Sequence, residues 1–374
     1  MRDGYNSSPF EIASLMPTFS SALISWQCEH GRNDLPWQGA DPYRVWLSEV
    51  MLQQTQVATV IPYYLRFVAS FPDVVTLANA SEDEVLAHWS GLGYYARGRN
   101  LHRAARMIVD IHGGQFPQQY EQILALPGIG RSTAAAISAQ AFHERRAILD
   151  GNVKRVLARY CGISGQTSKR AVEEELWQQA ELLLPDLDIA TYTQALMDMG
   201  AMLCTRSRPK CAVCPVQGDC IAMQTGRVNV LPTPKQKKLV PERSATFLLA
   251  MSDGKILLEK RKSSGIWGGL WCLPQFDEED DVQNWCALHG IESDKLIRHH
   301  SEIGEPADSI AQCEALVPFA HVFTHFKLHI TPLLLYLAHK PPHQTEHVWL
   351  ELDQALQAAI PTPVRLLLSR LANF

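Results

Sequence analysis

The stretch Leu126-Pro127-Gly128-Ile129-Gly130-Arg131-Ser132 separates two helical patterns in this 374-residue chain. Apolar residues recur at helical spacing before it, and residues 133–137 begin a second helix. Two glycines around one apolar residue let the backbone approach a large ligand, since neither carries a Cβ. Free N–H groups at the start of the second helix would favour an anion such as phosphate. By itself, the turn is equally compatible with an ordinary αα-hairpin.

Length and composition place the chain among globular proteins with two or three domains. Its apolar fraction of 46% is ample for packed cores. No run of ~18 apolar residues is present, so we expect no membrane segment. Because the first residues lack the apolar core of a signal peptide, we expect a cytoplasmic protein.

The net charge of -5 is unevenly distributed along the chain. Residues 245–374 carry ten basic and sixteen acidic residues, which leaves 24 basic and 23 acidic residues in 1–244. Basic residues cluster within 97–106, 145–159 and 206–210. Such clusters can attract a phosphate backbone, although each one can also be an ordinary solvated helix face.

The pattern along the chain predicts two domains joined by a linker. Residues up to about 225 are almost entirely helical in pattern, and a capping box at 81–84 starts one helix. Beyond Val228, strand-like runs at 246–250 and 255–258 flank an Asp253-Gly254 turn. Further strands are expected at 315–319 and 329–337. We therefore predict a helical domain over 1–228, a linker over 229–243 and an α+β domain over 244–374.

Four of the nine cysteines lie close together in the sequence. They are Cys204, Cys211, Cys214 and Cys220, with spacing Cys-x6-Cys-x2-Cys-x5-Cys. This spacing favours an iron–sulfur cluster, with zinc and unligated thiols as the alternatives. Basic neighbours at 206–210 make the loop a candidate phosphate contact, and electron transfer is the rival role.

The turn, Asp150 and the four cysteines together resemble the helix-hairpin-helix DNA glycosylase superfamily, and within it the MutY type of adenine glycosylases. Further matching motifs are Leu35-Pro36-Trp37, residues 46–56, Gly91-Leu92-Gly93-Tyr94-Tyr95-Ala96-Arg97 and Leu149-Asp150-Gly151-Asn152-Val153. The resemblance implies a multidomain protein with an all-α glycosylase domain that holds a 4Fe-4S cluster on the four cysteines. It also implies a second, Nudix-like domain.

The activity that this resemblance implies is removal of adenine mispaired with 8-oxoguanine or guanine. Cleaving an N-glycosidic bond requires a proton for the departing base and a negative group beside the sugar cation. Glu49 matches the general acid of the family, and Asp150 matches the carboxylate that stabilises the cation. Without the resemblance, Glu49 would be a surface helix carboxylate and Asp150 the N-cap of the following helix.

The resemblance also assigns residues that bind DNA. Asn152 matches a residue that orients the catalytic carboxylate or the water. Gln54 and Tyr94 match residues that wedge into the base stack when the adenine is flipped out. Trp37 and Gln194 match positions in the adenine pocket, although Trp37 alone would more often be a core residue. The remaining expected DNA contacts are Gln53, Gly128, Gly130 and Ser132.

Ser132 distinguishes this chain from relatives that also cut the DNA strand. In the endonuclease III-like enzymes the residue after Gly-Arg is a lysine, which attacks the sugar and forms a Schiff base. A serine hydroxyl cannot form an imine. The sequence therefore predicts a monofunctional glycosylase that leaves an abasic site, although a lysine elsewhere could cause weak nicking.

The second domain resembles a Nudix-like module, with Gly265–Pro274 matching the lead-in to a Nudix box. The metal-binding Arg-Glu-x-x-Glu-Glu pattern is absent from 277–289, so pyrophosphate hydrolysis is not expected. We expect this domain to read 8-oxoguanine through Phe323, Thr324 and His325. The family usually has Phe-Ser-His here, so the threonine keeps the hydroxyl but adds a methyl group.

These observations predict a monomeric, nucleoid-associated enzyme that acts on duplex DNA containing 8-oxoguanine:adenine or guanine:adenine mispairs. Two rival hypotheses remain at this stage. One is a glycosylase of the same fold with another base preference or with lyase activity. The other is a non-catalytic DNA-binding iron–sulfur protein, which retention of both Glu49 and Asp150 disfavours.

Overall fold

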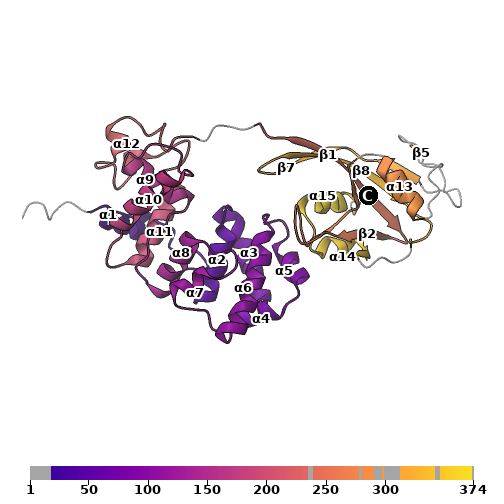
Figure 1. Cartoon of the computed structure of the whole chain (residues 1–374), viewed down its shortest axis with the longest axis horizontal. Coiled ribbons are helices and arrows are strands. Elements are labelled where there is room, and N and C mark those ends of the chain that lie inside the picture. Colours follow the sequence, from indigo (N-terminus) through magenta and orange to yellow (C-terminus); the bar gives the residue numbers. More distant parts are fainter. Residues whose placement is uncertain are drawn as a thin grey trace, which may run out of the picture. The chain divides into compact units, whose positions relative to one another are not determined.

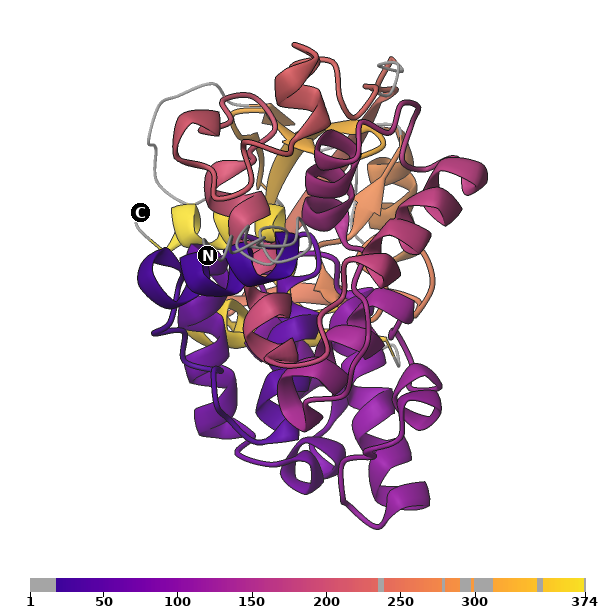
Figure 2. The same ribbon diagram turned by 90° about the vertical axis from the view of Figure 1, so that its left-hand side faces the viewer.

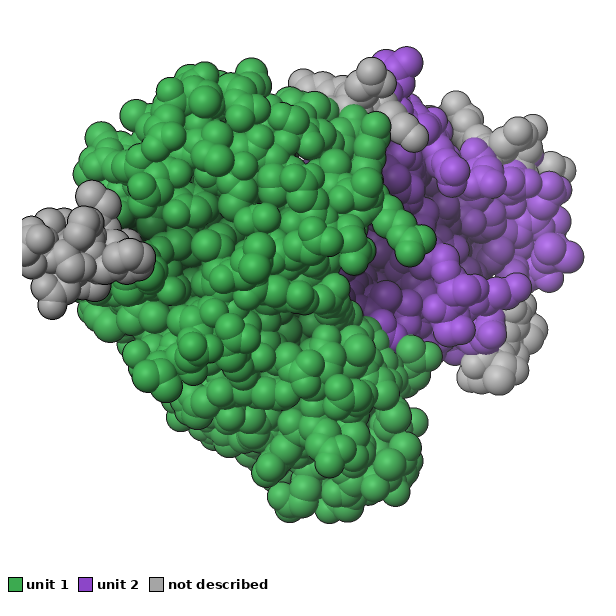
Figure 3. All heavy atoms as spheres, turned by 60° about the vertical axis from the view of Figure 1, so that its left-hand side comes forward, with its two compact units in different colours: residues 1–79, 103–236 green, residues 80–102, 237–374 purple. Residues whose placement is uncertain are grey.

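The computed structural model describes residues 18–234, 239–277, 280–289, 297–298, 312–341 and 346–372. The chain forms two compact units (Figure 3). Unit 1 contains residues 1–79 and 103–236, and unit 2 contains residues 80–102 and 237–374. The assignment follows spatial contacts, so residues 80–102 are grouped with the C-terminal part of the chain.

Unit 1 is built from helices, drawn from indigo to magenta in Figures 1 and 2. Its α-helices are α1 (Phe19–His30), α2 (Pro42–Leu52), α3 (Val57–Ser70), α4 (Val74–Asn79), α7 (Tyr120–Leu124), α8 (Arg131–Phe142), α9 (Gly151–Tyr160), α10 (Arg170–Leu182), α11 (Ile189–Asp198) and α12 (Ile221–Gln224). A π-helical turn, η1 (Met199–Leu203), follows α11, and a 3-10 turn, η2 (Cys211–Val213), lies in the cysteine loop.

The predicted helical hairpin is confirmed, with α7 and α8 on either side of the turn. Gly128 adopts a left-handed backbone with φ 81°, which a residue with a Cβ enters only at a cost. Gly130 is the N-cap of α8 and has an ordinary φ of -102°. The small residues of α8, Ala134 to Ala136 and Ala139, are buried, so this helix can pack closely against α2 and α11.

A hydrophobic core holds the helices around the hairpin together. Residues of α1, α8, α9, α10 and α11 meet in one buried cluster. Its largest contributors include Phe19, Trp26, Trp177 and Tyr192. Because α9 starts at Gly151, this packing sets where Asp150 lies relative to the hairpin.

Unit 2 combines one mixed sheet with helices. Its strands are β1 (Glu242–Ser252), β2 (Lys255–Lys260), β3 (Trp271–Cys272), β4 (Gln275–Phe276), β5 (Ile297–Arg298), β6 (Gln312–Ala315), β7 (Phe319–Val322), β8 (Lys327–Tyr336) and β9 (His347–Glu351). The main path of the sheet runs β3-β2-β1-β8-β6-β5, with β4 on β1, β7 on β8 and β9 on β2. The parallel pairing of β1 with β8 continues from Glu242↔Lys327 to Met251↔Tyr336.

Three helices accompany the sheet in the C-terminal sequence: α13 (Asp280–Leu288), α14 (Leu352–Gln357) and α15 (Thr362–Leu371). Apolar residues of α13, including Val282 and Trp285, pack on Leu248 and Leu335 of the central strands. The predicted Asp253-Gly254 turn is confirmed, since both residues have positive φ, at 49° and 71°. The strand predicted over 315–319 is wrong, because β6 ends at Ala315 and β7 begins at Phe319.

Residues 80–102 contain α5 (Glu82–Trp89) and the start of α6 (Ala96–His112). The predicted capping box is confirmed: the Ser81 hydroxyl accepts from the Glu84 N–H at 3.2 Å, and the Glu84 carboxylate accepts from the Ser81 N–H at 2.7 Å. Within the described part of the chain, every helix is too short or too polar to span a membrane.

Candidate active site

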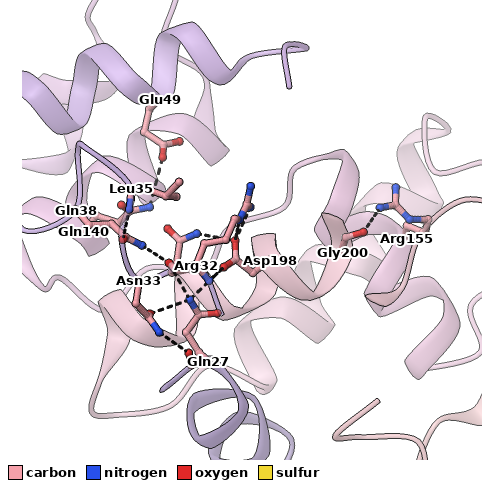
Figure 4. A network of polar contacts seen from close by, with 11 residues as sticks. Gln27, Arg32, Asn33, Leu35, Gln38, Glu49, Gln140, Arg155, Asp198 and Gly200 are labelled. Carbon is pink, nitrogen blue, oxygen red and sulfur yellow. Dashed lines mark hydrogen bonds and ion pairs between the residues drawn. The ribbon is translucent and has the colours of Figure 1, made fainter. Parts of the chain in front are cut away.

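Glu49 lies on α2 among buried apolar neighbours. The helix starts with Asp41 as N-cap and Pro42 in its first turn, and Trp46 and Val50 on either side of Glu49 are buried. The Glu49 carboxyl accepts from the Gln140 side chain of α8 at 3.3 Å (Figure 4). Burial, followed by the charge of Asp150, raises its pKa to about 7. A carboxyl in this state can hold a proton near neutral pH.

Asp150 is the N-cap of α9. This is the role expected of it from the sequence without the family resemblance. Its carboxylate accepts from the Val153 N–H at 2.7 Å. Burial raises its pKa, although hydrogen bonds from the Val153 and Asn152 backbones act in the opposite direction. Capping does not exclude a chemical role, because the charge of this carboxylate still acts on Glu49. The structure therefore brings the two predicted carboxyls to one site.

Ser132 connects the hairpin to the chain just before Asp150. Its hydroxyl accepts from the Leu149 N–H at 3.0 Å. The serine lies in the first turn of α8, and Leu149 is buried. The hydroxyl thus satisfies a backbone donor in the extended segment that leads to α9.

Arg155 joins Asn152 to the cysteine loop, a connection that sequence reasoning missed. Its guanidinium donates to the Gly200 carbonyl at 2.6 Å (Figure 4). It also donates to the Asn152 side chain at 2.8 Å. Its Nε donates to the Cys204 carbonyl at 2.7 Å. A Cβ on Gly200 would lie 2.6 Å from that of Asn152, so glycine is required in this π-helical turn. In the sequence Arg155 belongs to a basic cluster, and such a cluster is equally typical of a solvent-exposed helix face. The cluster therefore did not indicate these contacts.

The four cysteines of the predicted metal loop line a common cavity with apolar residues such as Val156 and Leu203. Arg159 is 3% exposed, and it donates to the Cys204 Sγ at 3.3 Å and to the Thr205 carbonyl at 2.7 Å. The cysteines that the structure describes are free thiols. Among the described side chains, none are grouped as a preassembled metal-ligand set.

Gln194 belongs to a buried polar network around Asp198, which is fully buried. Figure 4 shows Arg32 and Gln27 of this network beside Asp198. The Asp198 carboxylate accepts from Gln194 at 2.7 Å, from Gln27 at 3.1 Å and from the Arg32 N–H at 2.7 Å. The Arg32 guanidinium also binds it. Arg32 and Asp198 are 166 residues apart in sequence, so no local pattern could have predicted this pair.

The network fixes the loop that carries Trp37. The Gln38 side chain donates to the Arg32 carbonyl at 2.6 Å and accepts from the Leu35 N–H at 2.9 Å. Trp37 itself is 1% exposed and packs edge-on against Tyr64, with ring centroids 5.2 Å apart. In this structure it is a core residue.

The two neighbouring glutamines at the end of α2 have different surroundings. The Gln53 side chain lies 3.4 Å from the Gly128 carbonyl and 3.4 Å from the Thr133 hydroxyl, so it contacts the hairpin. Gln54 is exposed and has a left-handed φ of 59°. This conformation is uncommon for a residue with a side chain and is enriched at functional sites.

Tyr94, in unit 2, shares this backbone feature. Its φ is 50°, and its side chain is 43% exposed. Gly91 and Gly93 of the same loop are also left-handed. The Arg97 guanidinium donates to the Gly93 carbonyl at 3.1 Å and lies 5.5 Å from the Tyr94 ring centroid. The loop therefore presents an exposed aromatic ring on a constrained backbone.

Phe323, Thr324 and His325 form the turn between β7 and β8. The Phe323 N–H donates to the Phe326 carbonyl at 2.9 Å, and the two rings stack with centroids 4.4 Å apart. Thr324 and His325 are exposed. The turn therefore exposes the Thr324 hydroxyl and the His325 imidazole next to the stacked rings of Phe323 and Phe326.

Several residues of the predicted basic clusters do not lie at the surface. Arg97 and Arg159 are buried, while Lys154 pairs with Glu173. Desolvating a guanidinium is offset only by hydrogen bonds, and both arginines bind backbone carbonyls. These two arginines are therefore used inside the fold, whereas other members of the clusters remain exposed: Arg103, Arg106, Arg206, Arg208 and Lys210.

Two family models match the chain. Residues 47–181 match the HhH-GPD superfamily base excision DNA repair protein model, and residues 245–370 match the NUDIX domain model. The first match contains the hairpin and both carboxyls. The second contains nearly all of the sheet and the Phe323–His325 turn.

Whole-length relatives are also found. The chain is 36% identical to an adenine DNA glycosylase of Buchnera aphidicola over 94% of this chain and 96% of that protein. It is 34% identical to an adenine DNA glycosylase of Mus musculus, over 96% of this chain and 79% of that protein. A solved thermostable thymine-DNA glycosylase has 28% identity and a TM-score of 0.51, covering 55% of this chain and 95% of that structure.

The raised pKa of Glu49 predicts a cost to stability that depends on pH. Below about pH 4.5 the carboxyl is neutral in both folded and unfolded chains, whereas above pH 7 it is charged in both and folding must bury that charge. Glu49→Gln should therefore raise the free energy of unfolding by about 1–3 kcal/mol at pH 8 and change it little at pH 4. Urea unfolding at both pH values measures this. An equal effect at both would contradict the assignment.

Proposed function

The chain belongs to the adenine DNA glycosylase family, whose members are hydrolytic DNA repair enzymes, and we propose that it removes adenine paired with 8-oxoguanine or guanine. The single observation that carries the proposal is the pair of coupled carboxyls in unit 1, one of which has a pKa near 7. Hydrolysis of an N-glycosidic bond needs one protonated and one ionised carboxyl in the same site.

Glu49 is the general acid in this proposal. Its pKa of about 7 keeps a large part of the population protonated at neutral pH, so it can donate a proton to a ring nitrogen of the flipped adenine. Gln140 holds one carboxyl oxygen, which leaves the other for the base. Protonation weakens the glycosidic bond because the departing adenine then leaves as a neutral molecule.

Asp150 supplies the negative charge as the sugar becomes cationic. The backbone N–H of Val153 fixes its carboxylate, so the charge needs no reorganisation during the reaction. Asn152 lies two residues on, and Arg155 orients its amide by binding Oδ1. The Asn152 amide nitrogen is therefore free of that contact, and we assign it to Asp150 or to the attacking water.

Gln54 and Tyr94 are the proposed wedge residues. Both are exposed, and both have left-handed backbones, which hold a side chain in a direction that regular structure does not offer. A flipped base leaves a gap in the duplex, and an aromatic or amide side chain can fill it. We assign Gln194 to the adenine pocket and Trp37, which is a core residue here, to the packing that supports the pocket, because the Asp198 network joins α11 to the Trp37 loop.

The hairpin is the proposed phosphate contact. Gly130 has an ordinary φ, and a Cβ built on it would meet nothing within 4 Å. The fold itself therefore does not require glycine there, and the space beside Gly130 is open to a ligand. We assign that space to a DNA phosphate, which the N-terminus of α8 would attract. Gly128 and Gln53 shape the same turn.

The strand is left intact in this proposal because Ser132 cannot act as an amine nucleophile. Its hydroxyl is already engaged by the Leu149 N–H, which gives the residue a structural task. The product is an abasic site.

Lesion reading is assigned to Phe323, Thr324 and His325, because the exposed Thr324 hydroxyl can contact 8-oxoguanine. The sequence of α13 lacks the Arg-Glu-x-x-Glu-Glu pattern of a Nudix metal helix, so this domain is assigned to recognition.

The four cysteines are proposed to hold a 4Fe-4S cluster. The donor set fits, because four thiols line one cavity whose other walls are largely apolar. When bound, the cluster would supply rigidity to the loop from Cys204 to Cys220. Arg155 and Arg159 tie that loop to α9, the helix that Asp150 caps.

We further propose a monomer that works in the cytoplasm at the nucleoid, where its DNA substrate lies.

A strand-break assay tests the proposed reaction. Purified protein is incubated with a duplex that contains one adenine opposite 8-oxoguanine, and the DNA is scored before and after alkali. We expect breaks at the adenine only after alkali, and none with Glu49→Gln, which should still bind the duplex. Breaks without alkali would indicate lyase activity, and an active Glu49→Gln variant would refute the acid role.

Gly130→Ala tests the hairpin as a phosphate contact. The added methyl meets open space within the chain, so the melting temperature should change by only a few degrees. The affinity for duplex DNA should fall roughly tenfold, because the methyl stands between the α8 N–H groups and the phosphate. Fluorescence anisotropy measures the affinity. An unchanged affinity in a folded Gly130→Ala variant would contradict the assignment of the hairpin to phosphate.

Iron analysis tests the cofactor assignment. The purified protein should contain ~4 iron atoms per chain and absorb visible light through thiolate-to-iron charge transfer. Cys214→Ser should lose iron and lower the melting temperature. Zinc in place of iron at one atom per chain would show that the cysteines hold a structural zinc.

A further inference from the structure

Residues 80–102 are packed against the C-terminal sequence within unit 2. On α5, the Asp83 carboxylate accepts from the Trp271 indole at 3.2 Å and forms an ion pair with Lys260. The Lys260 ammonium lies 4.7 Å from the Trp271 ring centroid. At the start of α6, Arg99 donates to the Gly268 carbonyl. These contacts join α5 and α6 to β2, β3 and the turn between them.

A second set of contacts reaches the Tyr94 loop itself. The buried Ser90 hydroxyl donates to the Ile360 carbonyl at 2.5 Å and accepts from the Arg365 guanidinium at 2.9 Å. The Tyr95 hydroxyl is hydrogen-bonded to the side chains of Ser90 and Thr362. Ser90 precedes the loop and Tyr95 follows Tyr94. Both ends of the loop are therefore anchored to the start of α15 and the segment before it.

We propose that Arg365 and Thr362 of α15 are positioning residues for the Tyr94 wedge. The inference rests on the proposed function, in which Tyr94 enters the base stack. Three residues of the loop have left-handed φ: Gly91, Gly93 and Tyr94. Such a loop loses much conformational freedom when ordered. Anchors at Ser90 and Tyr95 remove part of that freedom before DNA binds, which lowers the cost of insertion.

The anchor depends on an arginine for a geometric reason. One arm of the Arg365 guanidinium donates to Ser90, and the other donates to the Leu356 carbonyl, which follows the last strand. A planar fork can reach both acceptors at once, whereas an ammonium is a single point. The Ser90 hydroxyl directs its proton at the Ile360 carbonyl, so its oxygen is left to accept from the Arg365 guanidinium and to contact the Tyr95 hydroxyl.

In this proposal unit 2 contributes both parts of lesion recognition. The Phe323–His325 turn belongs to its C-terminal sequence, and Tyr94 belongs to residues 80–102. Contacts within the unit tie the wedge loop to the domain that matches the NUDIX model. Damage to α15 should therefore impair wedge insertion while leaving Glu49 and Asp150 intact.

Arg365→Gln tests the proposal, with Arg370→Gln as the matched control. Arg370 is on the same helix, and its guanidinium lies 5.5 Å from the Phe319 ring centroid, away from the loop contacts. Two quantities are measured: the single-turnover excision rate, and the fluorescence of 2-aminopurine placed beside the 8-oxoguanine, which rises when the base is unstacked. Arg365→Gln should lose most of the fluorescence rise and slow excision roughly tenfold, the size expected for one buried charged hydrogen bond. Arg370→Gln should change neither.

Tyr94→Ala separates failure of this inference from failure of the proposed function. If Tyr94→Ala leaves fluorescence and excision unchanged, the wedge assignment itself is wrong. If Tyr94→Ala is impaired but Arg365→Gln matches Arg370→Gln, the positioning inference is wrong. In the double variant, Arg365→Gln should add little to the defect of Tyr94→Ala. Fully additive effects would also overturn the inference, because Arg365 would then act elsewhere.

Ser90→Ala keeps the test valid if Arg365→Gln unfolds the protein. It removes one hydroxyl and leaves the charge of α15 in place. Circular dichroism melting first establishes that each variant is folded. A folded Ser90→Ala variant should lose the fluorescence rise in the same way, and a normal signal would count against the anchor.

Discussion

The burial of Glu49 beside Asp150 is the constraint on which the rest of unit 1 depends. Two carboxyls in one poorly solvated site cannot both ionise freely, so one retains a proton to about pH 7. The fold must offset the cost of holding such a pair. It does so with hydrogen bonds from Gln140 to Glu49 and from the α9 backbone to Asp150. The same burial that costs energy keeps Glu49 protonated to a higher pH than an exposed carboxyl.

Three elements hold the Asp150 end of this pair. Ser132 binds the backbone at Leu149, the first turn of α9 binds the carboxylate, and Arg155 fixes Asn152 to the π-helical turn. The Cys204 carbonyl accepts from the same guanidinium. The first turn of α9, whose backbone binds the Asp150 carboxylate, is therefore hydrogen-bonded through Arg155 to the start of the cysteine loop.

Features encoded in short stretches of sequence were predicted well. The hairpin, the capping box at Ser81 and the Asp253-Gly254 turn depend on the residue types within a few positions, and the structure confirms them. The basic clusters were less informative. A run of arginines has the same sequence signature whether its guanidiniums face solvent or, as with Arg159, bind buried carbonyls. Packing decides whether each guanidinium faces solvent or the interior, and the spacing of arginines along the sequence does not indicate which.

The amino-acid sequence indicated the glycine turn and the four cysteine positions by their spacing, and it indicated the two carboxyls only through the resemblance to the glycosylase family. The tertiary structure alone revealed the contact of Gln140 with Glu49, the Arg32–Asp198 pair and the attachment of the Tyr94 loop to Arg365. Each of these depends on groups that are distant in sequence. Desolvation and hydrogen bonding act over a few ångströms of space, so such groups influence one another only after the chain has folded.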